Sequence, residues 1–143
     1  MLTEACRNAV RAVVFLASQD DPSSRHTVRE IAASIGGPEA FVAKVLQTMS
    51  REGLISASKG PNGGMYLTAR QCARPVLDIV KCIDGLDVFR ECGLGLQKCS
   101  AQRPCPMHDA YAALRDALLL SYKTTTIKDL ADSVRKGDAV LHR

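Results

Sequence analysis

The chain has 143 residues, of which 46% are hydrophobic and 24% are charged, a composition that excludes a disordered tail or a collagen-like chain. Its 19 basic residues exceed its 15 acidic residues by four, so the charge permits a nucleic-acid partner without requiring one. No apolar run approaches the length of about 18 residues that a membrane helix needs, and the N-terminus lacks the apolar run of a secretory signal. We therefore expect a cytoplasmic protein with no membrane partner.

The first two predicted helices have recognisable starts. Residues 3–18 carry apolar side chains at helical spacing, and Thr3 is a suitable N-cap. After a loop, the run from Thr27 to Glu30 has the form of a capping box. In such a box the Thr27 side chain caps the helix while Glu30 reaches back to the Thr27 amide. A second helix is therefore predicted to begin directly after Thr27.

The next segments predict a winged helix-turn-helix. Glycines at 36–37 end the short second helix, and a third helix runs over 38–53 with its apolar residues on one stripe. Two short strands at 54–58 and 65–67 flank the breaker-rich turn 59–64. Helix-turn-helix followed by a β-hairpin is the winged-helix order. The expected fold is mainly α, with a two-stranded hairpin as the wing. The alternative is a small α+β domain whose hairpin has no role.

The second half of the chain predicts more helices around an irregular segment. A helix restarts at Arg74-Pro75, whereas 85–106 holds glycines, prolines and three cysteines and is expected to be irregular. The pattern over 107–123 is helical again, and Thr126 caps a last short helix. From about 136 onward the chain is expected to fray.

The helix at 107–123 is predicted to form a dimer interface. Its apolar residues concentrate at 111, 114, 118 and 119, and this stripe needs a partner to cover it. The alternative is that the helix packs back on its own domain. The resulting division is a DNA-binding domain at 1–84, a cysteine-containing sensor loop at 85–106, and a dimerisation helix with a C-terminal helix and tail at 107–143.

Basic residues concentrate on the predicted winged helix. Residues 44–74 include five basic residues and one acidic residue, the excess of positive charge expected for phosphate contacts. The start of the second helix would meet the DNA backbone, the start of the third would face the major groove, and the wing would reach the minor groove. Phe41 has two interpretations, as a contact to a thymine methyl or as core. The candidate DNA-binding residues are Thr27, Arg29, Glu39, Phe41, Lys44, Lys59, Gly60, Pro61, Asn62 and Gly63.

Six cysteines are many for a chain without a secretion signal, and such a set is more often metal-binding or redox-active than a disulfide framework. Cys92, Cys99 and Cys105 share one loop with six and five intervening residues, and His108 follows. Thiolates are the soft ligands of iron–sulfur clusters and zinc, although this spacing matches neither zinc-finger nor ferredoxin spacing. The alternative is that these are incidental buried cysteines. Their neighbours are Gly, Gln, Lys and Ser, unlike a core, whereas the remaining cysteines, Cys6, Cys72 and Cys82, have apolar neighbours.

The ordered set of motifs resembles the IscR/NsrR-type winged-helix regulators of bacteria. The matching pieces are LTEACRNAVRAVVFLA, VREIAASIGGPEAFVAKVLQTMSREGLI, the wing KGPNGGMYL, PVLDIVKCIDG, and then the triad Cys92, Cys99 and Cys105. The resemblance implies that the triad ligates a [2Fe–2S] or [4Fe–4S] cluster whose state controls DNA binding. It also implies a homodimer with the long C-terminal helix at its interface.

The match to this family has departures. The first cysteine gap is six residues where five is common. His108 stands where the IscR-like branch has its histidine ligand. The NsrR-like branch instead takes an acid from the partner's first helix, at about the position where this chain has Arg7. The competing candidates for the fourth ligand are Glu4 of the partner subunit, Asp109 and a small exogenous molecule. Some family members carry no cluster and sense through thiol chemistry.

The sequence thus predicts a homodimeric transcriptional regulator that binds a partly palindromic stretch of double-stranded DNA. Its signal is expected to be iron–sulfur, nitric oxide or redox status, read through a cluster on Cys92, Cys99, Cys105 and His108. No enzyme site is expected, because no histidine pairs with a nucleophile motif and no glycine loop precedes a helix to bind phosphate. Two alternatives remain: a metal-free thiol-based redox sensor of the same fold, and a metal or cluster carrier without specific DNA binding.

Overall fold

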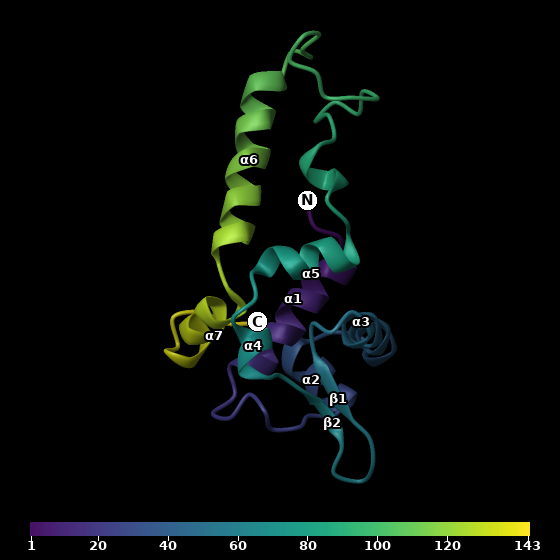
Figure 1. Cartoon of the computed structure of the whole chain (residues 1–143), viewed down its shortest axis with the longest axis vertical. Helices are drawn as coiled ribbons and strands as arrows, with labels where there is room; N and C mark the ends of the chain where they lie inside the picture. Colours follow the sequence, from purple (N-terminus) through teal and green to yellow (C-terminus); the bar gives the residue numbers. More distant parts are fainter.

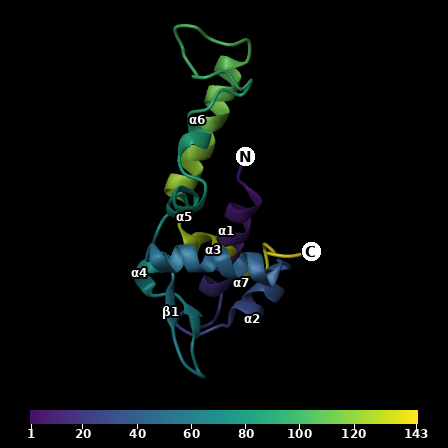
Figure 2. The same ribbon diagram turned by 90° about the vertical axis from the view of Figure 1, so that its right-hand side faces the viewer.

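A computed structural model describes residues 1–143 and shows a helical head from which an arm extends (Figure 1). The arm consists of α6 and the segment that leads up to it, and the hairpin projects from the opposite end of the head (Figures 1 and 2). No helix is long and apolar enough to cross a membrane. The elements are α1 (Glu4–Ala17), α2 (Val28–Ile35), α3 (Glu39–Arg51), β1 (Ser56–Ser58), β2 (Gly64–Tyr66), α4 (Ala69–Cys72), α5 (Val76–Ile83), the 3-10 turn η1 (Asp87–Phe89), α6 (His108–Thr124) and α7 (Ile127–Arg135).

The predicted helix starts are confirmed by their cap hydrogen bonds. The Thr3 hydroxyl accepts from the amide of Cys6 and begins α1. Thr27 and Glu30 form both bonds of the capping box that opens α2. Gly36 ends that helix with φ of 64°, a left-handed conformation that glycine adopts without a steric penalty. The winged helix-turn-helix is therefore set by the local signals on which the prediction relied.

Helix α1 lies at the centre of the head and packs against α2, α3, α5 and α7. Leu16, Ile31, Leu46 and Ile79, from α1, α2, α3 and α5, are fully buried in one core. The last helix also contributes to this core, since Ile127 is fully buried there. Side chains from six helices and from the residues that flank the hairpin strands thus form one hydrophobic cluster.

The hairpin pairs β1 and β2 antiparallel, with Ala57 opposite Met65. The observed strands are shorter than the predicted 54–58, because Leu54 and Ile55 are buried in the core instead of pairing across the hairpin. His26 adds a further rung, since its backbone exchanges two hydrogen bonds of 2.8 and 2.9 Å with Met65. The wing is thus attached to the segment that leads into α2.

The arm leaves and rejoins the head at neighbouring points. The chain returns to the head at Thr125, where the Val76 amide donates to the Thr125 carbonyl at 2.9 Å and the Ile127 amide donates to Arg74 at 3.0 Å. The prediction grouped α7 with α6 in residues 107–143, whereas α7 packs against α1 in the structure. Residues 85–124 therefore form one segment that projects from the head and returns to it. The short α4 and η1 are additions to the prediction, and each is about one turn long.

Cys6 joins α1 to the end of α5. Its side chain is fully buried, and burial raises the pKa of the Cys6 thiol to about 12, with smaller contributions from the charge and hydrogen bond of Asp84. Asp84 also accepts from the Thr3 amide at 2.9 Å and from the Thr3 hydroxyl. The Asp84 carboxylate thus accepts two hydrogen bonds from Thr3 at the start of α1, immediately before the chain enters the arm.

The Cys6 thiol makes stability fall at alkaline pH. In the unfolded chain the thiol ionises at its ordinary pKa of 9.0, whereas burial in the folded protein keeps it neutral up to a pKa of about 12. Its contribution to stability is therefore fully present below pH 9 and is lost as the pH rises toward 12. Urea unfolding at pH 8, 9.5 and 10.5 should show a steeper loss for the wild type than for Cys6→Ala. Equal pH dependence of the two proteins would contradict this assignment.

Candidate functional site

The outer face of α3 carries the side chains suited to base contacts. Lys44, Gln47 and Arg51 are exposed at i, i+3 and i+7, opposite the buried stripe that packs against α1. An amine or guanidinium suits guanine, and a glutamine amide suits adenine. Gln47 was absent from the predicted set, although the spacing that identifies the buried stripe also places position 47 beside 44 and 51. The predicted Glu39 is exposed in the first turn of α3.

Phe41 lies at the flank of α3. Its side chain is 37% exposed, and it lines a cavity of about 240 Å³ together with Lys44, Thr48 and Cys82. This cavity separates the outer part of α3 from the end of α5. The side chain is thus neither part of the buried core nor on the most exposed face of the helix.

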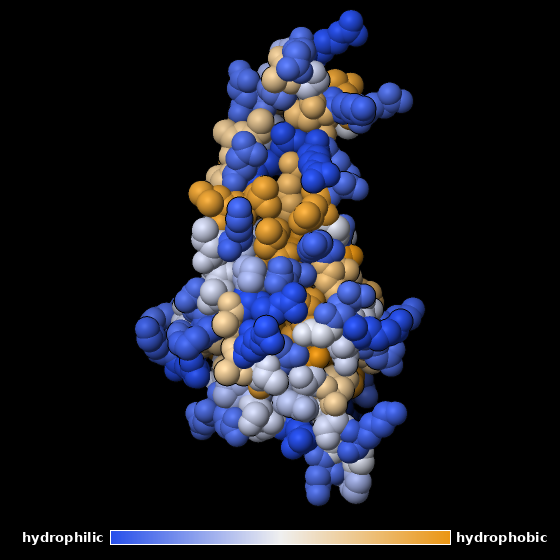
Figure 3. Space-filling view, in the orientation of Figure 1, coloured by the Kyte–Doolittle hydropathy of each residue, from blue (hydrophilic) through white to orange (hydrophobic).

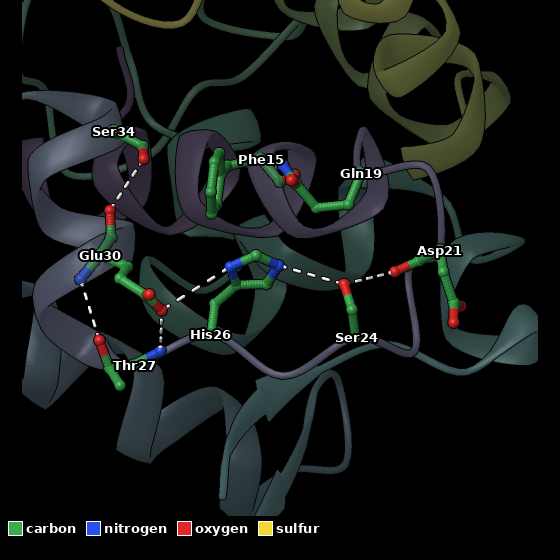
Figure 4. Close-up of polar contacts among 8 residues, drawn as sticks. All are labelled: Phe15, Gln19, Asp21, Ser24, His26, Thr27, Glu30 and Ser34. Carbon is green, nitrogen blue, oxygen red and sulfur yellow. Dashed lines mark hydrogen bonds and ion pairs between the residues drawn. The ribbon is translucent and has the colours of Figure 1, made fainter. Parts of the chain in front are cut away.

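A hydrogen-bonded cluster around His26 holds the start of α2 in place (Figure 4). The His26 ring lies edge-on to Phe15, with 5.4 Å between ring centroids. Its Nε2 is 3.2 Å from the Ser24 hydroxyl, and its Nδ1 is 3.8 Å from Glu30, the capping-box acid. The predicted phosphate-contacting residues Thr27 and Arg29 follow directly and are exposed.

Ser24, His26 and Glu30 contact one another in the order serine, histidine, acid, as in a catalytic triad, but they cannot act as one. The Ser24 hydroxyl donates its proton to the carbonyl of Asp21 at 2.6 Å. The His26 ring must therefore donate to the Ser24 oxygen, whereas a general base has to accept the nucleophile's proton. The cluster is a brace for α2.

The wing presents its turn to solvent. Lys59, Gly60, Pro61 and Asn62 are all exposed, and the side chains of Lys59 and Asn62 have no protein partner. Gly63 is required by space, because a Cβ there would come 2.2 Å from the carbonyl oxygen of Ser58. The turn thus exposes one cation and one amide on the same side of the molecule as the start of α2.

The three loop cysteines are free thiols in different environments. Cys92 is only 7% exposed, which differs from the expectation that this loop is unlike a core. Cys99 and Cys105 are half-buried. Hydrogen bonds from the backbone amides of Leu94 and Leu96 lower the pKa of the Cys92 thiol, with smaller effects of Cys105 and the Arg115 charge. The backbone of the loop thus favours the thiolate at Cys92.

The predicted ligands lie in two contacting pairs. Sγ of Cys99 is 3.2 Å from Nδ1 of His108, the first residue of α6. Cys105 lies near enough to Cys92 to help lower the pKa of the Cys92 thiol. No three His, Cys, Asp or Glu side chains lie close enough together to hold a single metal ion. A cluster distributes its ligands over several irons, so donor pairs are compatible with it. The donor chemistry, three free thiols and an imidazole, therefore fits an iron–sulfur cluster.

The winged head and the exposed basic side chains define a helix-turn-helix transcriptional regulator. Comparison with known proteins makes this more specific: the family model Rrf2, described as an iron-dependent transcriptional regulator, matches residues 2–133. The chain belongs to the Rrf2 family of transcriptional regulators. The predicted regulator class is confirmed, and the family and its named relatives are regulators, not enzymes.

Relatives and solved structures support this assignment. An Aquifex aeolicus protein described as an HTH-type transcriptional regulator is 31% identical over 138 residues, covering 95% of this chain and 94% of its own. Protein aau3 of Rhizobium meliloti is 32% identical, covering 90% and 83%. The fold is shared with CymR, the global cysteine regulator of B. subtilis, with a TM-score of 0.73, 18% identity, and 92% and 96% coverage. It is also shared with IscR of T. potens, with a TM-score of 0.71, 15% identity, and 98% and 92% coverage.

Proposed function

We propose that this chain is a homodimeric regulator that binds a partly palindromic operator and senses its signal through an iron–sulfur cluster on the cysteine loop. The observation that carries the proposal is the grouping of Cys92, Cys99, Cys105 and His108 in one loop at the start of α6, with every thiol free. When bound, the cluster would supply a centre that responds to iron supply, nitric oxide or oxidants.

The chain itself prepares the loop for such a group. Amide donors stabilise negative charge at Cys92, and His108 offers a nitrogen ligand that is already beside Cys99. Replacing a fourth thiolate by an imidazole weakens the hold on the cluster, which suits a sensor better than an electron carrier. His108 starts α6, so a bond to it would connect the cluster with that helix.

Support for a dimer comes from α6, in which none of the 17 residues is buried. Leu114 and Leu118 are 69% and 38% exposed on one face, and Ser121 and Thr125 continue that face into a cavity of about 620 Å³ against α1. Figure 3 shows hydrophobic side chains gathered on the arm above the head. A second copy of α6 would cover the apolar face and fill the cavity.

A thiol-based regulator of the same fold is the second candidate. This candidate is favoured because Cys105 lies near Cys92, and the pKa of the Cys92 thiol is lowered. A thiolate beside a thiol is the arrangement that an oxidant converts to a disulfide. The fold is shared with CymR, the global cysteine regulator of B. subtilis. It is also shared with CymR of Staphylococcus aureus, for which one structure is described as an oxidized form. A colourless protein whose two cysteines are linked on oxidation would favour this candidate.

Single Cys→Ala changes at 92, 99 and 105 should each abolish the visible absorbance of anaerobically reconstituted protein, along with its bound iron and sulfide. Cys72→Ala and Cys82→Ala should retain all three, because these residues lie in the head, away from the loop. His108→Ala should retain some cluster with a changed spectrum or lifetime. If the loop variants absorb visible light as strongly as the wild type, the cluster assignment is wrong.

Lys59→Ala should weaken operator binding and reduce the slope of log K against log salt by about one, the value for one lost phosphate contact. Lys136→Ala is the matched control, because it removes an exposed lysine next to α7 instead of the wing. Fluorescence anisotropy over a salt series measures both. A slope that Lys59→Ala leaves unchanged would mean that the wing does not contact DNA.

Leu118→Glu should convert the dimer to a monomer, because it places a charge in the apolar face that the second copy covers. Leu120→Glu should remain a dimer, since Leu120 is 60% exposed on a different face of α6. Light scattering after size exclusion gives the mass of each. A Leu118→Glu variant with the mass of the wild type would contradict this interface.

A further inference from the structure

Arg115 contacts the cysteine loop and has no carboxylate partner. Its guanidinium donates to the carbonyl oxygen of Glu91 and, at 3.4 Å, to Sγ of Cys99. Its Nε is buried without a partner, and none of the ion pairs in the structure includes it. A guanidinium is always charged, and a half-buried charge is costly unless an opposite charge faces it. Both hydrogen-bond partners of the guanidinium, a carbonyl oxygen and a cysteine sulfur, lie on the cysteine loop.

Tyr111 forms the second contact between α6 and the loop. The Arg115 guanidinium lies 5.5 Å from the centroid of the Tyr111 ring, a cation–π distance. On the loop side, a Cβ at Gly93 would come 2.7 Å from the same ring, so the glycine backbone rests directly against it. His108, Tyr111 and Arg115 follow one another at i, i+3 and i+7 and present one continuous face to the loop.

We propose that Arg115 is the positioning residue of the cysteine loop. Its guanidinium holds the loop against α6 by donating to the Glu91 carbonyl and to the Cys99 sulfur, while Tyr111 seats Gly93. The inference rests on the proposed function, because the loop that Arg115 holds carries the proposed cluster ligands. Arg115 and Tyr111 thereby dock residues 91–99 on the proposed dimer helix.

Hydrogen exchange of the full-length, cluster-free protein tests the docking. Amides of residues 91–99 should exchange roughly tenfold faster in Arg115→Met, as expected for losing a hydrogen bond to a charged group. Arg115→Lys should exchange more slowly than Arg115→Met, because its ammonium group can still donate a hydrogen bond to the loop. Arg103→Met, which removes an exposed arginine of the same loop, should match the wild type. Wild-type exchange in Arg115→Met, or equal acceleration by Arg115→Lys and Arg115→Met, would overturn the proposal.

A redox titration of the reconstituted protein gives a readout that a purely structural role would not move. A cation beside a cluster favours the more negative, reduced state, so Arg115→Met should lower the midpoint potential and Arg115→Lys should restore part of it. An unchanged potential in Arg115→Met would overturn the proposal. Failure of the wild type to take up iron and sulfide would refute the cluster assignment instead, and hydrogen exchange would still decide the role of Arg115.

Discussion

The burial of α1 is the constraint on which the rest of the structure depends. Eight of its 14 residues are buried, and α2, α3, α5 and α7 all pack on it. Alanines at 9, 12 and 17 let these helices approach closely, while Leu16 fills the centre. The one buried polar side chain, Asn8, accepts a hydrogen bond from Arg11. Because α3 rests on this helix, the position of the side chains proposed to face DNA is set by the packing of α1.

The arm meets the head where α1 and α5 come together. Asp84 holds the start of α1, and hydrogen bonds join Val76 to Thr125 and Arg74 to Ile127 at the other end of the arm. Both α1 and α5 pack against α3. A displacement of the arm would therefore act on the two helices that support α3, the proposed recognition helix. This arrangement gives the proposed sensor loop a mechanical connection to DNA binding without any direct contact between them.

The basic surface and the cysteine loop differ in how far the sequence predicts them. Lys44 on α3 and Lys59 on the wing are predicted from helical periodicity and from the breaker-rich turn, because each depends on a few neighbouring residues. The same periodicity places Gln47 beside Lys44, although the prediction did not include it. The contacts of Cys99 with His108 and Arg115 span 9 and 16 residues. No periodicity governs an irregular loop, so these contacts depend on how the loop folds back on α6.

The sequence by itself determined where most helices begin and end, since cap residues such as Thr27 and glycines such as Gly36 act through bonds within a few residues. It also determined the regulator class, through motifs arranged in order along the chain. The tertiary structure alone decided that α7 returns to the core through Ile127, that Cys92 is buried, and that Arg115 faces a sulfur. These features arise from long-range burial and from charge compensation, which depend on side chains that only the folded chain brings together.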